Sequence, residues 1–176
     1  MDIHIDYQRR VERVREGLAK RGLDLFLATR GKSVNWIGGA FIPWRSVLPV
    51  SKDGFIRLNT LLMDAERLKT DSWLGDRVVG TAPLPGLELW DVTVQQIKDL
   101  GLDKGVIGVE LGHSPRMIAG YLFATEYEFL KEKLPQAKFV NALGLMDEIT
   151  FIKDPQEIQL MRQAAAIADA AQERCR

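Results

Sequence analysis

Length, composition and charge are those of one ordinary globular domain, because 176 residues, 46% of them hydrophobic and 27% charged, can bury a core of their own. The 24 basic residues balance the 24 acidic ones, and the apolar runs are far shorter than the roughly 20 residues that cross a bilayer, so we expect neither a nucleic-acid partner nor a membrane partner. The polar start and the single cysteine, Cys175, predict a cytoplasmic protein without an internal disulfide or a multi-thiolate zinc site.

An amphipathic helix opens the chain. Apolar residues recur there at intervals of four, three and four, with charged residues between them, at Tyr7, Val11, Val14 and Leu18. Gly22 supplies the stop, and the apolar run at 23–28 predicts a buried strand directly after it. A helix, a glycine and a buried strand in that order indicate an α/β layer fold.

The middle of the chain repeats this alternation. Residues 31–54 are the least regular part, with a short helix expected near Val34 and a strand at 47–50. Further strands are predicted at 60–63, 106–110 and 137–140, and helices at 64–70 and 89–100. The prolines at 81–86 indicate an irregular loop, and residues 142–153 are predicted to be a connection.

One more helix entry is expected late in the chain. The Ser114 hydroxyl can accept a free backbone N–H, and Pro115 suits the first helical position. The helix should then run to about Lys133, where Pro135 closes it.

The last segment has a strong helix start. Asp154 can cap the helix, Pro155 suits its first position, and Glu157 completes a capping box. An apolar stripe follows at Ile158, Met161, Ala165 and Ala168. No glycine, asparagine or proline follows to end this helix, so we expect the chain to stop inside a longer protein, with a natural helix that frays at its end as the alternative.

Residues that could bind a metal are few and scattered. The two histidines, His4 and His113, share no metal-ligand spacing, and His113 is interpreted as a loop residue. Four neighbouring acids are typical of a solvated surface, namely Asp64, Glu66, Asp71 and Asp76. Phosphate-binding glycine motifs and a nucleophile elbow are missing from the sequence. We therefore predict no catalytic residue, no metal ligand and no cofactor within this chain.

A glycine-rich stretch at 35–45, NWIGGAFIPWR, carries the side chains that usually anchor interfaces and ligand pockets. Trp36 and Ile37 are expected to pack into the core. Pro43 should hold the tip of the stretch in an exposed turn. Three residues at that tip are predicted to contact a substrate or a partner subunit, with core packing as the alternative: Phe41, Trp44 and Arg45.

The segment at 151–169, FIKDPQEIQLMRQAAAIAD, closely resembles the segment that joins the two domains of creatinase, prolidase and aminopeptidase P, the pita-bread hydrolases. Three further stretches resemble the N-terminal domain of that family in the same order, GLDLFLA, NWIGG and IGVE at 22–28, 35–39 and 107–110. Two positions depart from the family pattern, because Trp36 replaces a usual tyrosine and Thr150 a common arginine.

The resemblance implies an α/β domain at residues 1–150, a mixed β-sheet flanked by helices with ribonuclease H-like topology. Residues 151–176 would be a linker and the start of the first helix of an absent catalytic domain. The five metal ligands of the family belong to that domain, so two divalent metals (Mn, Co or Zn) would bind there and not to this chain. The implied role is a non-catalytic domain that forms a homodimer and covers the active site of a neighbouring subunit.

For the full-length parent, the resemblance implies an Xaa-Pro dipeptidase or aminopeptidase that activates a bridging water with its metals. In relatives, aromatic and basic residues of one loop reach the partner's active site, and Phe41, Trp44 and Arg45 occupy that region. A creatinase-like amidinohydrolase is the alternative parent within the family. A free-standing module whose aromatic loop binds a ligand or a partner protein is the alternative outside it.

Overall fold

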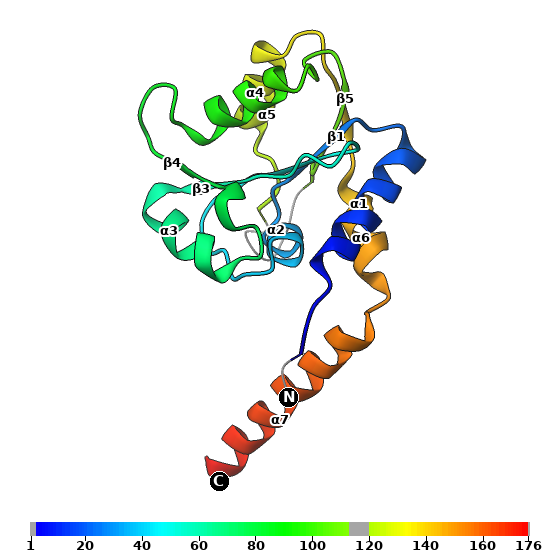
Figure 1. The fold of residues 1–176 in the computed structure, drawn as a ribbon, viewed down its shortest axis with the longest axis vertical. Coiled ribbons are helices and arrows are strands. Elements are labelled where there is room, and N and C mark those ends of the chain that lie inside the picture. Colours follow the sequence, from blue (N-terminus) through cyan, green and yellow to red (C-terminus); the bar gives the residue numbers. More distant parts are fainter. Residues whose placement is uncertain (1–2, 113–119, 176) are drawn as a thin grey trace.

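A mixed β-sheet forms the centre of the molecule, whose computed structural model describes residues 3–112 and 120–175 (Figure 1). Four strands pair in the order β2, β1, β5, β6, and they span Leu48–Ser51, Leu25–Ala28, Val106–Val109 and Lys138–Asn141. β1 runs antiparallel to β2 and parallel to β5, and β5 runs parallel to β6. The strands expected at 23–28, 47–50, 106–110 and 137–140 are therefore confirmed.

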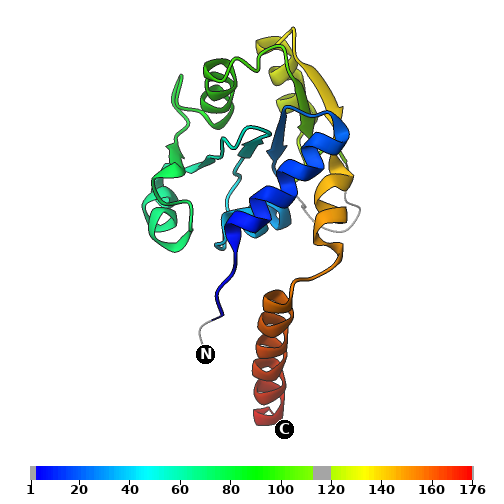
Figure 2. The ribbon, with the colours of Figure 1, turned by 45° about the vertical axis from the view of Figure 1, so that its right-hand side comes forward.

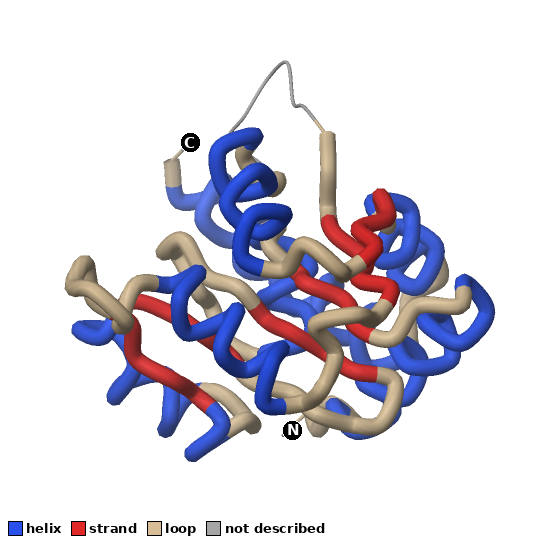
Figure 3. The backbone as a smooth tube through the Cα atoms, turned by 90° about the horizontal axis from the view of Figure 1, so that it is seen from above, coloured by secondary structure: helices blue, strands red, loops and turns tan. Residues whose placement is uncertain are grey.

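Two further parallel strands form a separate pair beside β2. They are β3, Leu58–Leu61, and β4, Val78–Thr81, and they pair with each other over their full length. An isolated antiparallel bridge between Val47 and Asn59 joins this pair to the β2 side of the sheet. Seen from above, the strands follow one another across the molecule with helices on either side (Figure 3).

Helices cover both faces of the sheet. Four of them contribute to one apolar cluster, namely α1 (Tyr7–Arg21), α2 (Gly31–Gly38), α3 (Leu62–Asp71) and α6 (Leu143–Phe151). The second cluster is built with α4 (Leu89–Asp99) and α5 (Ala124–Lys133). Because successive side chains of a strand point to opposite faces, β1 places Phe26 in the first cluster and Leu25 and Leu27 in the second. The predicted α/β class, a mixed sheet flanked by helices, is confirmed.

The opening helix has the ends that the sequence predicts. The Asp6 side chain accepts a hydrogen bond from the backbone N–H of Arg9, which caps the start of α1. Gly22 ends the helix with φ of 62°, a left-handed conformation that glycine adopts without strain. The expected apolar stripe points into the core, since Val14 and Leu18 are fully buried.

The strand expected at 60–63 begins two residues earlier, and its neighbouring helix begins at Leu62. The reason is Asn59, a polar residue that lies fully buried inside β3. Its amide donates to Thr93 at 3.0 Å and to Gln96 at 2.9 Å, which satisfies it without water. Because Asn59 is polar, the apolar pattern of the sequence does not mark it as part of a buried strand.

The helix expected from Ser114 to Lys133 is shorter than predicted. Residues 120–123 are not helical and α5 begins at Ala124, while Ser114 and Pro115 lie outside the described residues. The start of α5 is capped instead by Glu126, whose carboxylate accepts the backbone N–H of Phe123 at 2.8 Å.

The sequence-based prediction lacks α6, β4 and the short 3-10 helix η1, Gly75–Arg77. Residues 142–153 were expected to form a connection, but most of them form α6, whose Leu145 and Met146 are fully buried. At its start the Asn141 side chain accepts the Leu143 backbone N–H at 3.0 Å, and the helix packs against α1. The strand β4 contains Gly80, where an added Cβ would lie 2.5 Å from Leu62, so close packing and not strand propensity selects that residue.

The helix α7, Pro155–Arg174, extends away from the sheet and the other helices (Figures 1 and 2). Its predicted capping box is confirmed, because the backbone N–H of Asp154 donates to Glu157 at 2.8 Å. None of its residues is buried. Within residues 3–112 and 120–175, no helix combines the length and the apolar character of a membrane span.

Asp24 fixes the entry of β1 and supports a prediction about pH. Its carboxylate accepts Lys52 Nζ at 2.7 Å and the Val106 N–H at 2.8 Å, and these donors hold the pKa of Asp24 below its ordinary value. A lowered folded-state pKa stabilises the protein above the unfolded pKa of about 3.9, and this contribution disappears as the pH falls through the folded value. Asp24→Asn should therefore cost about 1–2 kcal/mol at pH 7 and progressively less towards pH 3.

Urea unfolding at both pH values measures this difference. Asp169→Asn, an exposed substitution on α7, serves as the matched control and should behave like the parent chain at each pH. A cost of Asp24→Asn that stays constant between pH 7 and pH 3 would show that the ionised carboxylate is not the stabilising species.

Candidate functional site

A cavity of about 280 Å³ opens beside the carboxyl end of β1. Its wall includes Thr29, which directly follows that strand, together with the loop that leads into β2 and residues next to α5. Carboxyl ends of parallel strands are where open α/β sheets commonly bind ligands. Trp44 and Arg45, two of the residues that the sequence singles out, line this cavity. We therefore take it as the candidate site.

The loop tip presents two aromatic rings to solvent. Phe41 is 72% exposed and Trp44 is 52% exposed, on either side of Pro43. The loop is held from below, because Asn35 accepts the Ile42 N–H at 3.0 Å. Exposed rings on a supported loop can bury a large area against another surface at low entropic cost. Neither ring is packed in the core, which was the alternative for these two residues.

Arg45 is partly buried and is held by an ion pair and a backbone carbonyl. Its Nε donates to Glu126 Oε1 at 3.0 Å, its Nη2 contacts the other oxygen of the same carboxylate, and its Nη1 donates to the Gly120 carbonyl at 2.8 Å. The guanidinium also lies 4.9 Å from the centre of the Phe123 ring. This bidentate pair balances the charge of Arg45 and joins the loop to α5. Arg45 thus lines the cavity with its position fixed and its charge balanced by Glu126.

Thr29 lines the cavity, but its hydroxyl oxygen is itself buried. Thr29 is 4% exposed, and its Oγ1 has no hydrogen-bond partner within the part of the chain that the structure describes. Buried polar atoms are usually satisfied. This hydroxyl is therefore one of two exceptions among the buried side-chain polar atoms of the described residues.

A buried carboxylate fixes the turn that carries Thr29. Glu110 is fully buried and accepts the backbone N–H groups of Thr29 and Arg30, both at 2.8 Å. It also accepts Arg30 Nε and the Ser33 hydroxyl, both at 2.7 Å. Burial alone would lower the pKa of Arg30, but the carboxylates of Glu110 and Asp147 outweigh it and raise that pKa, so the guanidinium stays charged.

The sequence indicates Glu110 only as the end of a strand and misses its part in this network. A fully polar cluster assembled from residues about 80 positions apart leaves no local pattern. The one signal that the sequence offers is the glutamate at the end of a buried apolar strand, because a buried carboxylate requires a partner in the fold.

Three of the four neighbouring acids, Asp64, Glu66 and Asp71, are paired with cations. Arg67 holds two of them, since its Nε donates to Asp64 at 2.7 Å and its Nη1 to Asp71 at 2.7 Å. Through the first contact Arg67 lowers the pKa of Asp64. Lys69 Nζ donates to Glu66 at 2.6 Å. Carboxylates paired in this way do not fit a metal site, and among the described residues no group of three or more His, Cys, Asp or Glu side chains could hold an ion. His4 is exposed, and His113 lies outside those residues.

Comparisons with known proteins agree with this architecture. A family model described as the Creatinase/Prolidase N-terminal domain matches residues 10–152. The ectoine hydrolase of Halomonas elongata is 29% identical over 177 aligned positions, which cover 92% of this chain and 41% of that protein.

Among solved structures, an Xaa-Pro dipeptidase from Bacillus anthracis superposes with a TM-score of 0.73 and 26% identity, over 96% of this chain and 42% of that one. The N-terminal domain of the peptidase PepQ from Mycobacterium tuberculosis superposes with a TM-score of 0.61 and 15% identity, over 80% and 98% of the two chains. The chain therefore spans less than half the length of the ectoine hydrolase and of the dipeptidase.

Proposed function

The chain belongs to the creatinase/prolidase N-terminal domain family, and from that premise we propose that residues 1–150 are the non-catalytic N-terminal domain of a longer Xaa-Pro dipeptidase or aminopeptidase. The observation that carries the proposal is the extent of the match, which takes in 96% of this chain and 42% of the Bacillus anthracis dipeptidase. The two divalent metals, Mn, Co or Zn, and the water that they activate belong in this proposal to a catalytic domain that follows.

Residues 151–176 then form the linker and the start of the first helix of that catalytic domain. The exposed apolar residues of α7 support this assignment, since Met161 is 59% exposed and Ile167 is 72% exposed. An amphipathic helix buries such residues against a neighbouring element when one is present. A cytoplasmic location remains part of the proposal.

The loop tip supplies the contact to a neighbouring subunit. We assign to Phe41, Trp44 and Arg45 the task of covering the partner's active site in a homodimer. The exposed rings beside a cavity of about 280 Å³ support this role for Phe41 and Trp44. The ion pair with Glu126 holds Arg45, and with it the loop, in position for that contact.

A creatinase-like hydrolase of a non-peptide substrate is the second candidate for the parent. The relative named ectoine hydrolase, 29% identical over 177 aligned positions, favours it. Both candidates give the N-terminal domain the same covering role. Parallel assays of the longer protein with Xaa-Pro dipeptides and with ectoine distinguish them.

Trp44→Ala tests the role of the loop. In the longer protein we expect the substitution to leave the fold intact and to raise KM about tenfold, because an exposed ring that anchors an interface is worth at least about 1.4 kcal/mol. Self-association should weaken in the same direction. Steady-state kinetics and sedimentation velocity measure the two effects.

Leu84→Ala is the matched control, because Leu84 is 55% exposed and lies in a different loop. It should leave both KM and the dimer unchanged. Unfolding of the Trp44→Ala protein would place that ring in the core and contradict the proposed role, as would kinetics and sedimentation identical to those of the parent.

A further inference from the structure

The first turn of α7 is bound to α1 and α2 through the carboxylate of Glu157. Arg10 of α1 donates through Nη2 to its Oε1 at 2.9 Å, and Trp36 of α2 donates through Nε1 to the same oxygen at 2.6 Å. The other oxygen accepts the backbone N–H of Asp154 at 2.8 Å. Three helices that are distant in sequence therefore meet at one side chain of α7.

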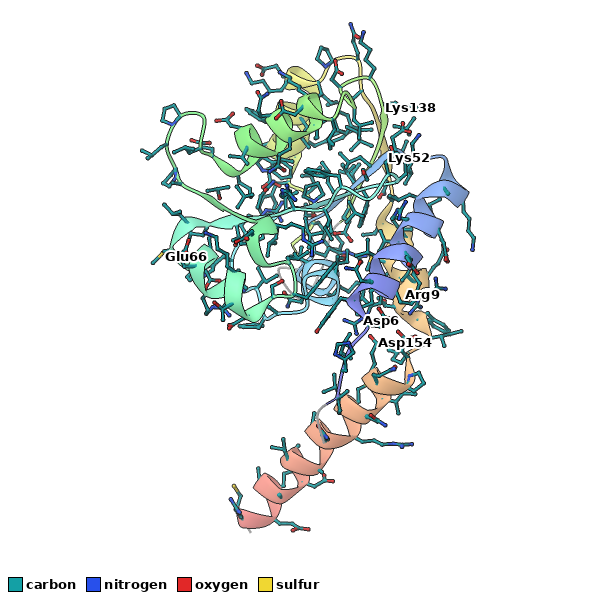
Figure 4. All side chains as sticks on the ribbon, viewed as in Figure 1. Asp6, Arg9, Lys52, Glu66, Lys138 and Asp154 are labelled. Atoms are coloured by element: carbon teal, nitrogen blue, oxygen red, sulfur yellow. The ribbon has the colours of Figure 1, made fainter. Side chains whose placement is uncertain are left out.

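A second arginine spans the connector between α6 and α7. Arg13 Nη1 lies 3.1 Å and 3.2 Å from the two carboxylate oxygens of Asp154, and Arg13 Nη2 donates to the carbonyl of Ile149. One side chain thus holds the end of α6 and the cap of α7 at once. Figure 4 shows Asp154 at this junction, where α7 leaves the body of the protein.

Aromatic rings hold the guanidinium of Arg10 in place. Its Cζ lies 5.3 Å from the centre of the Tyr7 ring and 4.6 Å from that of the Trp36 ring. Tyr7 in turn stacks on Trp73, with ring centres 5.8 Å apart and planes inclined by 3°. Cations over aromatic faces are attracted to them, so the rings and Glu157 favour the same position for Arg10.

The pair of Arg10 and Glu157 is shielded from water. The two side chains are 9% and 15% exposed, so dissolved salt screens the pair much less than a surface ion pair. Burial is the main influence on Arg10 and lowers its pKa, and the charge of Glu157 offsets part of that effect. Without Glu157 the guanidinium of Arg10 would lose its ionic partner in a poorly hydrated position. Its Nε already has no hydrogen-bond partner among the described residues.

Beyond this first turn, no side chain of α7 forms a hydrogen bond or an ion pair with another element among the described residues. Each residue from 158 to 175 is exposed. The junction therefore fixes both the position and the direction of a helix of 20 residues, which is about 30 Å long. A small rotation at its first turn becomes a displacement of many ångströms at its end.

We propose that Arg10, Arg13 and Trp36 form a latch on Glu157 and Asp154 that sets the direction in which α7 leaves the domain. The latch binds the capped first turn of a helix of the same chain, through two arginines and one indole N–H. This inference goes beyond the covering role proposed above and stands independently of it, because it rests on contacts within the chain and not on any reaction.

Distance measurements between two nitroxide labels test the latch in the 176-residue chain. Cys175 is the single cysteine and is exposed at the end of α7, and Lys20→Cys places a second label on the exposed side of α1. We expect a narrow distance distribution in the labelled parent. Glu157→Gln keeps a residue that can complete the capping box but removes the charge that binds Arg10, and it should at least double the width of the distribution.

Two further variants define the cause. Trp36→Phe keeps an aromatic ring beside Arg10 but removes the indole N–H together with one ring of the indole, and it should also broaden the distribution. Glu173→Gln removes a charge from the exposed far end of α7 and should leave the width unchanged. Hydrogen exchange of the amides at 158–161 should accelerate roughly tenfold in Glu157→Gln, while the amides of β1 keep the protection of the parent.

Three results would overturn the latch. The first is a distribution that is already broad in the parent chain. The second is an unchanged width and unchanged exchange at 158–161 in Glu157→Gln. The third is a loss of protection in β1 in that variant, because the contacts would then hold the fold together and would not orient α7.

Discussion

Glu110→Ala is expected to lower the free energy of unfolding by about 3–5 kcal/mol, because it leaves a buried cation without its partner. Glu110 is fully buried and accepts four hydrogen bonds, two from backbone N–H groups and two from side chains. Among the described residues Arg30, whose side chain is 5% exposed, would keep Asp147 and the Leu143 carbonyl as its hydrogen-bond partners. The turn that supports the candidate cavity would lose its anchor at the same time.

Urea unfolding of Glu110→Ala, Glu110→Gln and a surface control measures this effect. Glu110→Gln keeps the volume and one acceptor oxygen but not the charge, so its cost should be intermediate. Glu132→Ala, whose side chain is 72% exposed, should stay within about 0.5 kcal/mol of the parent. A loss below about 1 kcal/mol in Glu110→Ala would mean that the buried network adds little to the fold.

The second large effect concerns turnover, because we expect the 176-residue chain to have no hydrolytic activity of its own. The family model that it matches describes an N-terminal domain and covers residues 10–152. Carboxylates of this chain that are largely buried are paired with arginines. Glu110 binds Arg30, Glu157 binds Arg10 and Asp64 binds Arg67. Enzymes accelerate their reactions by about a millionfold or more, so the difference from an active longer protein should be unmistakable.

Local signals in the sequence were sufficient for several elements. The apolar spacing and Gly22 predict α1, the capping box predicts α7, and the apolar run at 23–28 predicts β1. In each case the physical cause lies within one turn or one strand. The loop tip belongs to the same class, because Pro43 favours an exposed turn and Phe41 is indeed largely exposed.

Other features depend on partners that are remote in sequence. The helix α6 exists because its apolar side pairs with α1, and Asn59 is acceptable in a buried strand because Thr93 and Gln96 satisfy it. Arg45 has its ionic partner 81 residues away, in Glu126. Neither pattern nor propensity records such pairings, which only the folded chain brings together.

Trp36 illustrates the difference well. The sequence predicts that it packs into the core, and its ring does pack against the first apolar cluster. Its indole N–H, however, donates to Glu157, a residue of α7 that lies 121 positions further along the chain. The sequence reveals the ring as an apolar group, whereas the hydrogen bond that ties α2 to α7 emerges only from the fold.

The measurement that tests the central claim most directly is an assay of Xaa-Pro dipeptide hydrolysis with added Mn²⁺, made on the purified 176-residue chain beside the longer protein that continues past Arg176. We expect turnover only from the longer protein and a background rate from the chain alone. Hydrolysis by the chain alone at a rate comparable to that of the longer protein would contradict the account, because the reaction would then belong to the residues described above.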